Sequence, residues 1–194
     1  MDFSADTIAA LGIGLGLAAA CGFRVFVPLL VLSLAARYDI VPLAAGWAWV
    51  GTTPAVLAFG TATILEAFGY FIPWIDHALD TVATPAAVVA GMVTSASVLT
   101  DLPPLVRWTA IIVGGGGLAA LVQSSTVALR AGSTLTTGGL ANPVVAAAEL
   151  GGSAVTSVFA VLLPLAALVA VVLGVLLLFG VARRVAKRRR QKPA

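Results

Sequence analysis

The sequence predicts an all-α, polytopic membrane protein with about five transmembrane helices and short interfacial helices between them. Of the 194 residues, 60% are apolar and only 10% are charged, whereas an ordinary soluble domain is about 25% charged. A soluble chain of this length could not cover its surface with so few charges, but lipid solvates apolar side chains directly. The charges are also concentrated at one end of the chain, which is typical of a membrane protein with a cytoplasmic tail.

The first apolar segment, residues 7–36, is too long to be one straight span. Its thirty residues would reach about 45 Å as a helix, while the hydrocarbon core of a bilayer is about 30 Å thick. Gly22 and Pro28 are therefore expected to break it. Because Pro28 has no N–H, the break is expected to leave the carbonyl of Arg24 without its helical donor.

Four further spans are expected at residues 54–71, 85–99, 105–131 and 153–181, the last with a kink at Pro164. Short interfacial helices are expected at 74–82, where apolar and acidic residues lie on different faces, and at 142–150. The Ser, Thr and Gly residues of 132–139 predict a loop. Residues 1–182 then form the helical membrane domain, and residues 183–194 form a basic cytoplasmic tail.

The basic tail sets the predicted orientation. Seven of the eleven basic residues lie in the last twelve positions, namely Arg183, Arg184, Lys187, Arg188, Arg189, Arg190 and Lys192. A basic run directly after an apolar segment indicates retention in the cytoplasm and attraction to anionic lipid headgroups, not nucleic-acid binding. We therefore expect a multi-pass protein of the bacterial inner membrane with its N-terminus outside. The loop charges agree: Arg37 and Arg107 fall inside, and the outer side receives Asp2, Asp6, Asp76, Asp80 and Glu149.

A weak internal similarity predicts an inverted repeat with halves at 7–100 and 105–182. At an offset of 101 residues, Gly16-Leu17-Ala18-Ala19 aligns with Gly117-Leu118-Ala119-Ala120, and Pro42 aligns with Pro143. Inverted repeats with interrupted helices are a recurrent transporter design.

Ionisable residues inside the apolar segments are the candidate functional residues, because a cation at the bilayer centre costs about 3 kcal/mol or more. Arg24 is expected to bind an anion or a lipid headgroup, to form half of a gating ion pair, or to form a salt bridge that holds two helices together. Glu66, on the next span, is its expected partner and is either a proton-coupling carboxylate or a structural one. Other polar residues either line a water-filled pathway or hydrogen-bond between helices; they are Gln123, Arg130, Asn142 and Glu149.

Asp76, His77 and Asp80 are a weaker candidate site for a divalent metal. The two carboxylates lie one helical turn apart and the imidazole lies beside them. One helix face does not present all three well, so a solvated polar face is the alternative. The single cysteine, Cys21, excludes an intrachain disulfide and a CxxC metal site. No cofactor is expected.

Several short motifs resemble those of one known family. They are Gly22-Phe23-Arg24 with Pro28, Glu66 followed by Pro73, Asp76 and Asp80, and Asn142-Pro143 with Glu149. Together they resemble the small bacterial membrane proteins catalogued as domain of unknown function 4126. The resemblance covers most of the chain except the basic tail. It implies a helical membrane fold and no particular activity.

Three functions are open at this point. The leading hypothesis is a small transporter or channel-like protein for a small, anionic solute. The first alternative is a non-transporting scaffold or lipid-binding protein whose buried polar residues only specify packing. The third is an interfacial metal-dependent enzyme that uses Asp76, His77 and Asp80, although the chain is not expected to be an enzyme. The sequence leaves the oligomeric state open, a homo-oligomer included.

Overall fold

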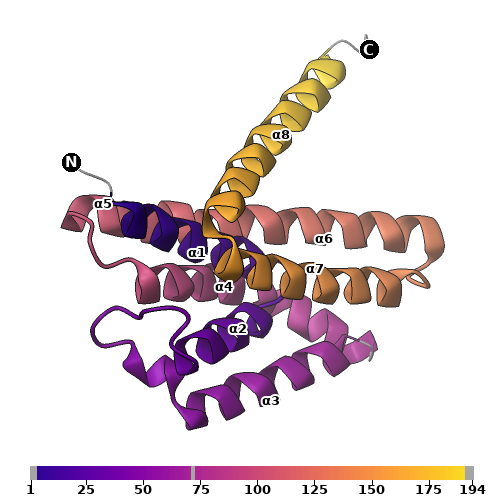
Figure 1. The fold of residues 1–194 in the computed structure, drawn as a ribbon. Helices are drawn as coiled ribbons and strands as arrows, with labels where there is room; N and C mark the ends of the chain where they lie inside the picture. The colour runs from indigo at the N-terminus through magenta and orange to yellow at the C-terminus, as the bar shows by residue number, and fades with distance from the viewer. Residues whose placement is uncertain (1–3, 71–72, 191–194) are drawn as a thin grey trace.

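The computed structural model describes residues 4–70 and 73–190, without the side chains of 73–78, 80, 81, 181, 182 and 184–190. The described chain is all-α (Figure 1), as predicted. Its helices are α1 (Ala5–Cys21), α2 (Phe26–Arg37), η1 (Ala48–Gly51), α3 (Thr53–Gly69), α4 (Pro73–Val98), α5 (Pro104–Thr109), η2 (Ala110–Gly116), α6 (Gly117–Thr137), α7 (Asn142–Leu162) and α8 (Pro164–Arg190).

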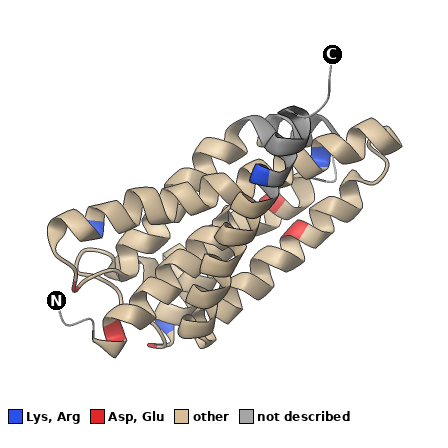
Figure 2. Cartoon of the chain, turned by 90° about the horizontal axis from the view of Figure 1, so that it is seen from above, with Lys and Arg blue, Asp and Glu red and all other residues tan. Residues whose placement is uncertain are grey.

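Two helical stretches of the described chain are long and apolar enough to cross a membrane. They are Asn142–Leu162 and Pro104–Thr137, in which α5, the π-helical segment η2 and α6 run on as one helix of 34 residues. Five shorter apolar helices accompany them. Figure 2 shows long stretches of helix without a charged residue.

Helices α1 and α2 form a hairpin that enters the protein and returns to the end from which it came. Asp6 in the first turn of α1, Ile40 just beyond α2 and Asp101 just beyond α4 line one cavity. The start of α1 and the chain leaving α2 both lie at the left of Figure 1, whereas the α6–α7 connection lies at the right. The prediction of a single broken span over 7–36 was therefore wrong.

The position of the turn explains the error. The helical pattern breaks between Gly22 and Val25, and α2 begins at Phe26. Pro28 thus lies in the first turn of α2, where its missing N–H is not needed by the helix. The proline marks the start of a second helix, and not a kink that frees the carbonyl of Arg24.

Close packing of backbone holds the tip of this hairpin against α6. A Cβ atom added at Gly22 would lie 2.5 Å from Cβ of Val122 and 2.7 Å from the carbonyl oxygen of Ala119. Only glycine allows so close an approach. The Ser153 hydroxyl of α7 donates to the carbonyl of Ala20 at 3.0 Å, in addition to the N–H groups of Phe23 and Arg24 in the turn, so α7 is tied to the end of α1.

Four helix boundaries differ from the predictions. The expected interfacial helix 142–150 is the first part of α7, which continues without a break to Leu162. The expected interfacial helix 74–82 and the span 85–99 are one helix, α4, with Pro85 inside it. The expected loop 132–139 is helical as far as Thr137, and Ser and Thr hydroxyls there bond to carbonyls within the helix, as Thr136 does to Gly132 at 2.9 Å. The expected kink at Pro164 is a break between α7 and α8.

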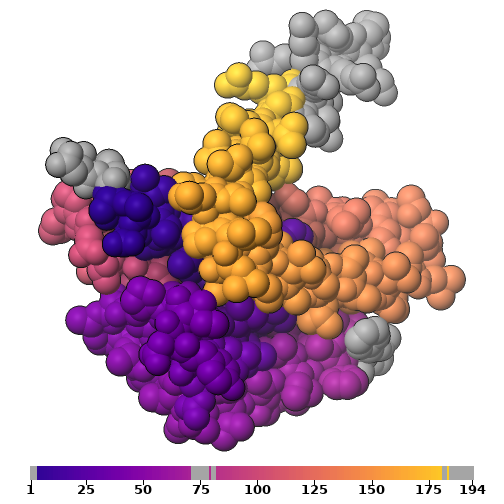
Figure 3. All heavy atoms as spheres, in the orientation of Figure 1, coloured from indigo at the N-terminus to yellow at the C-terminus, as the bar shows by residue number. Residues whose placement is uncertain are grey.

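Helix α8 projects from the body (Figures 1 and 3). It begins where a Cβ added at Gly12 of α1 would lie 2.1 Å from the carbonyl oxygen of Pro164. The predicted repeat is not matched in secondary structure, since the offset of 101 residues aligns the α1–α2 turn with residues 123–126 inside the continuous helix α6.

Gly22→Ala is expected to lower the free energy of unfolding by about 1–3 kcal/mol, because the added methyl group must displace the backbone of α6. Gly151→Ala is the matched control, since a Cβ at this helical glycine of α7 meets nothing within 4 Å. Its alanine should leave stability unchanged or raise it by up to about 1 kcal/mol. Unfolding of both variants in detergent, followed by circular dichroism, measures the difference. Equal stability of the two variants would contradict the tight α1–α6 contact.

Candidate functional site: a buried charge cluster at the hairpin tip

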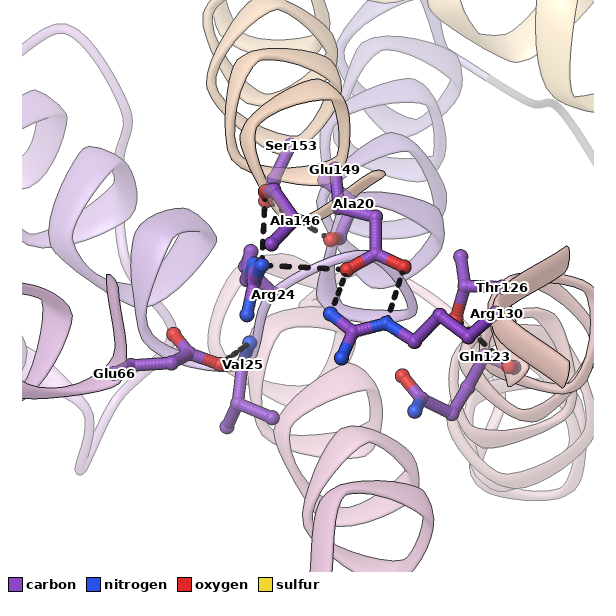
Figure 4. Close-up of polar contacts among 10 residues, drawn as sticks. All are labelled: Ala20, Arg24, Val25, Glu66, Gln123, Thr126, Arg130, Ala146, Glu149 and Ser153. Atoms are coloured by element: carbon purple, nitrogen blue, oxygen red, sulfur yellow. Dashed lines mark hydrogen bonds and ion pairs between the residues drawn. The ribbon is translucent and has the colours of Figure 1, made fainter. Parts of the chain in front are cut away.

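Arg24 lies in the α1–α2 turn, and its side chain is aimed into the protein. Its Nη2 donates to the carbonyl oxygen of Ala146 on α7 at 2.9 Å and lies 3.3 Å from Oε2 of Glu149. Figure 4 shows its guanidinium group between the carboxylates of Glu66 and Glu149. The hairpin therefore delivers a cation into the interior, where α7 supplies a carboxylate and a carbonyl to receive it.

Arg130 of α6 binds the same carboxylate. Its Nε donates to Oε1 of Glu149 at 2.9 Å, and its Nη2 donates to Oε2. This two-bond arrangement is the strong geometry for an arginine and a carboxylate. One carboxylate thus joins the hairpin, α6 and α7.

Both guanidinium groups also lie over the ring of Tyr70, which follows α3. The carbon atoms Cζ of Arg24 and Arg130 are 3.7 Å and 4.2 Å from the ring centroid. The face of an aromatic ring attracts a cation, most strongly where water is excluded. Tyr70 is itself buried, so it contributes to holding two like charges close together.

Glu66 of α3 binds the start of α2. The N–H of Val25 donates to Oε1 at 2.8 Å, and the N–H of Phe26 donates to Oε2 at 3.1 Å. A carboxylate at a helix N-terminus satisfies donors that the helix leaves open and is favoured by the helix dipole. Glu66 therefore ties α3 to the hairpin through backbone.

Among the residues whose side chains the structure describes, the cluster is buried and its charges balance. The exposed fractions are 2% for Arg24, 5% for Glu149 and 7% each for Glu66 and Arg130, and two cations balance two carboxylates. Yet Nε and Nη1 of Arg24 are buried and have no hydrogen-bond partner among the described residues. Buried charged donors are normally satisfied, so these two are the open binding capacity of the site.

The comparisons with known proteins place these residues within one family. Residues 11–184 match the family described as Domain of unknown function (DUF4126). The chain belongs to this family. No curated protein and no solved structure matched the chain. In this DUF4126 protein the matched region contains α2, all of α1 from residue 11 onwards, and the four described charges of the cluster.

Two predictions about the cluster of this DUF4126 protein need correction. The carboxylate that pairs with Arg24 within the described residues is that of Glu149, while Glu66 caps α2. Glu149 was also expected among the surface charges outside the membrane, but it is buried. Its apolar neighbours on α7 carry it into the core, which a short interfacial helix would not do.

The other predicted residues divide into three groups. Gln123 is buried on α6 beside the hairpin tip, where its backbone N lies 2.9 Å from a Cβ placed on Gly22. Asn142 is outside the cluster, since its Nδ2 donates to Thr134 at 3.2 Å near the α6–α7 connection. The side chains of Asp76, His77 and Asp80 lie outside the described part of the structure; among described residues no group of three His, Cys, Asp or Glu could hold a metal ion.

Sequence reasoning missed Tyr70 and the backbone groups of Val25, Phe26 and Ala146. Tyr70 lies four residues after Glu66, a spacing that puts two side chains on the same face of a helix. From that spacing an aromatic residue beside the buried charges could have been predicted. The backbone donors could not have been predicted from the sequence, because they depend on where α2 begins.

Glu149→Gln is expected to lower the free energy of unfolding by about 3–5 kcal/mol, because two buried guanidinium groups lose their shared counter-charge. Asp101→Asn removes an exposed carboxylate and should change stability by about 0.5 kcal/mol at most. Denaturant unfolding in one detergent compares the two. A loss no greater in Glu149→Gln than in the control would contradict the proposed role of the carboxylate.

Proposed function

We propose that the chain is a multi-pass protein of the bacterial inner membrane that moves a small anionic solute across the bilayer. Exposed Leu, Val and Phe side chains along α3, α6, α7 and α8 support a lipid environment, because a water-soluble monomer rarely exposes extended apolar surface. The spans in this proposal are α3, α4, the α5–η2–α6 stretch, α7 and α8. The hairpin α1–α2 enters the membrane and returns.

This arrangement keeps the two termini on opposite sides. With the basic tail in the cytoplasm, the N-terminus lies outside, as the sequence predicts. Because the hairpin returns to its own side, Arg37 and Arg107 then also lie outside, contrary to the loop charges counted for a single first span. The tail alone sets the proposed orientation.

The main support for anion transport is that Arg24 has two buried hydrogen-bond donors without a partner among the described residues. A purely structural cation needs only enough acceptors to satisfy its donors, and Glu149 and Ala146 supply them for one nitrogen only. Nε and Nη1 have no hydrogen-bond partner among the described residues and remain buried. An anion is the group that two such donors bind. Interrupted helices whose ends meet inside the membrane are where many transporters bind their solutes.

A second candidate function is lipid binding without transport. It is favoured by an apolar groove between α2, α3 and α4, whose lining includes Phe26, Trp47, Trp49, Phe59 and Val89. Trp47 and Trp49 stack with their ring centroids 6.3 Å apart, and tryptophan is enriched where membranes meet water. In this alternative an acyl chain occupies the groove and the charge cluster only fixes the packing.

Purified full-length chain in liposomes is expected to take up at least one of radiolabelled formate, acetate and chloride faster than protein-free liposomes do. Arg24→Gln should reduce that uptake by about ten- to a hundredfold, since hydrogen bonds to a charged group contribute about 1.5–3 kcal/mol. Arg37→Gln, which removes an exposed arginine, is the control and should transport normally. Uptake of none of the three anions above the protein-free rate would contradict transport and favour lipid binding.

If the hairpin is re-entrant, cysteines introduced before α1 and after α2 should both be accessible to a membrane-impermeant thiol reagent from the same side. Ser4→Cys and Asp39→Cys should both react from outside, whereas Leu140→Cys, in the α6–α7 connection, should react only from the cytoplasm. The native Cys21 is fully buried and should contribute no background. Labelling of positions 4 and 39 from opposite sides would contradict the re-entrant hairpin.

A further inference from the structure

We propose that the solute is a small monocarboxylate, and that the carboxylate of Glu66 occupies its binding site in this structure as a tethered stand-in. The inference rests on the proposed transport function and names the class of anion. It follows from three features of the site: the way in which Glu66 is held, the open donors beside it, and the weak attachment of the helix that carries it.

The two backbone donors fit a planar group with two oxygen atoms. Val25 donates to one carboxylate oxygen and Phe26 to the other, at 2.8 Å and 3.1 Å. A carboxylate satisfies both N–H groups at once, each with its own acceptor. A halide has one centre to share between them. The positive end of the α2 dipole adds to the attraction for any anion there.

Arg24 supplies the second, independent part of the site. The residue is 2% exposed, and Nε and Nη1 have no hydrogen-bond partner among the described residues. Its guanidinium group lies beside the Glu66 carboxylate and the Val25 backbone (Figure 4). The Glu66 oxygens are committed to Val25 and Phe26. A free carboxylate is not constrained by a side chain of fixed length, so it can approach both the backbone donors and Arg24.

Helix α3 has few buried residues, so it can move and withdraw the Glu66 carboxylate from the α2 N-terminus. Only Ala55, Glu66 and Gly69 are buried among the residues of α3, and Ile64, Leu65 and Phe68 are exposed. Glu66 is therefore the main polar anchor between α3 and the hairpin. When a solute carboxylate takes its place, α3 loses that anchor and can move, which couples binding to opening of the site.

The first test removes the stand-in and supplies a replacement. Glu66→Ala leaves room for a carboxylate with one further carbon, so formate and acetate are the probes. Each should raise the melting temperature of the detergent-purified variant by about 5 °C at saturation, whereas chloride at the same ionic strength should not. Asp101→Ala, which removes an exposed carboxylate, should show no such selective shift. Equal shifts with chloride and formate, or none, would overturn the proposal.

The second test uses transport, which a merely structural cap would not affect. If Glu66 fills the site nine-tenths of the time, its removal lowers the half-saturating formate concentration for uptake about tenfold. Glu66→Gln, whose amide has one carbonyl oxygen for the two backbone donors, should shift it in the same direction and serves in place of Glu66→Ala if that variant does not fold. An unchanged half-saturating concentration, or wild-type uptake of chloride equal to that of formate, would overturn the proposal.

The two proposals fail differently. Uptake of chloride with no preference for carboxylates would leave transport standing and reject the solute class. Selective stabilisation of Glu66→Ala by formate without uptake by any variant would leave the carboxylate site standing and reject transport.

Discussion

The shared carboxylate of Glu149 is the interaction on which the rest of the structure depends. It binds Arg130 through two hydrogen bonds and lies 3.3 Å from Nη2 of Arg24. Through it, the hairpin tip, α6 and α7 meet at one point. Two guanidinium groups with so little exposure would repel each other without this carboxylate between them. The ring of Tyr70 beneath both of them reduces the same cost.

The hairpin raises a second constraint, because it brings the ends of two helices into the interior. In the proposed membrane setting, irregular backbone is tolerated only where protein satisfies its polar groups. Here the hydroxyl of Ser153 binds the carbonyl of Ala20, and Glu66 accepts from Val25 and Phe26. Gly22 allows the turn to lie directly on the backbone of α6. The chain thus places a helix end capped by a carboxylate beside a buried arginine.

The sequence identified the costly residues but not their partners. Arg24, Glu66 and Arg130 stand out because each interrupts an apolar segment, and a buried charge is expensive wherever the fold places it. Pairing depends on direction: a single span would have put Arg24 opposite the next helix, whereas the hairpin turns it towards α7. A proline such as Pro28 gives the same sequence pattern whether it kinks one helix or lies in the first turn of another. The sequence therefore did not distinguish a kinked span from a hairpin. Glu149 was misplaced because its helix was expected to end within two residues of it, and α7 instead continues to Leu162.

In the proposed function Arg24 serves both stability and transport, since it holds the hairpin to Glu149 and has two donors without partners among the described residues. A double-mutant cycle of Arg24→Gln and Glu149→Gln, measured as the free energy of unfolding in detergent, tests the interaction between these two side chains directly. We expect the two losses not to be additive, with a coupling energy above about 1 kcal/mol, as for residues in direct contact. Losses that add to within about 0.5 kcal/mol would place the two side chains apart and contradict the cluster.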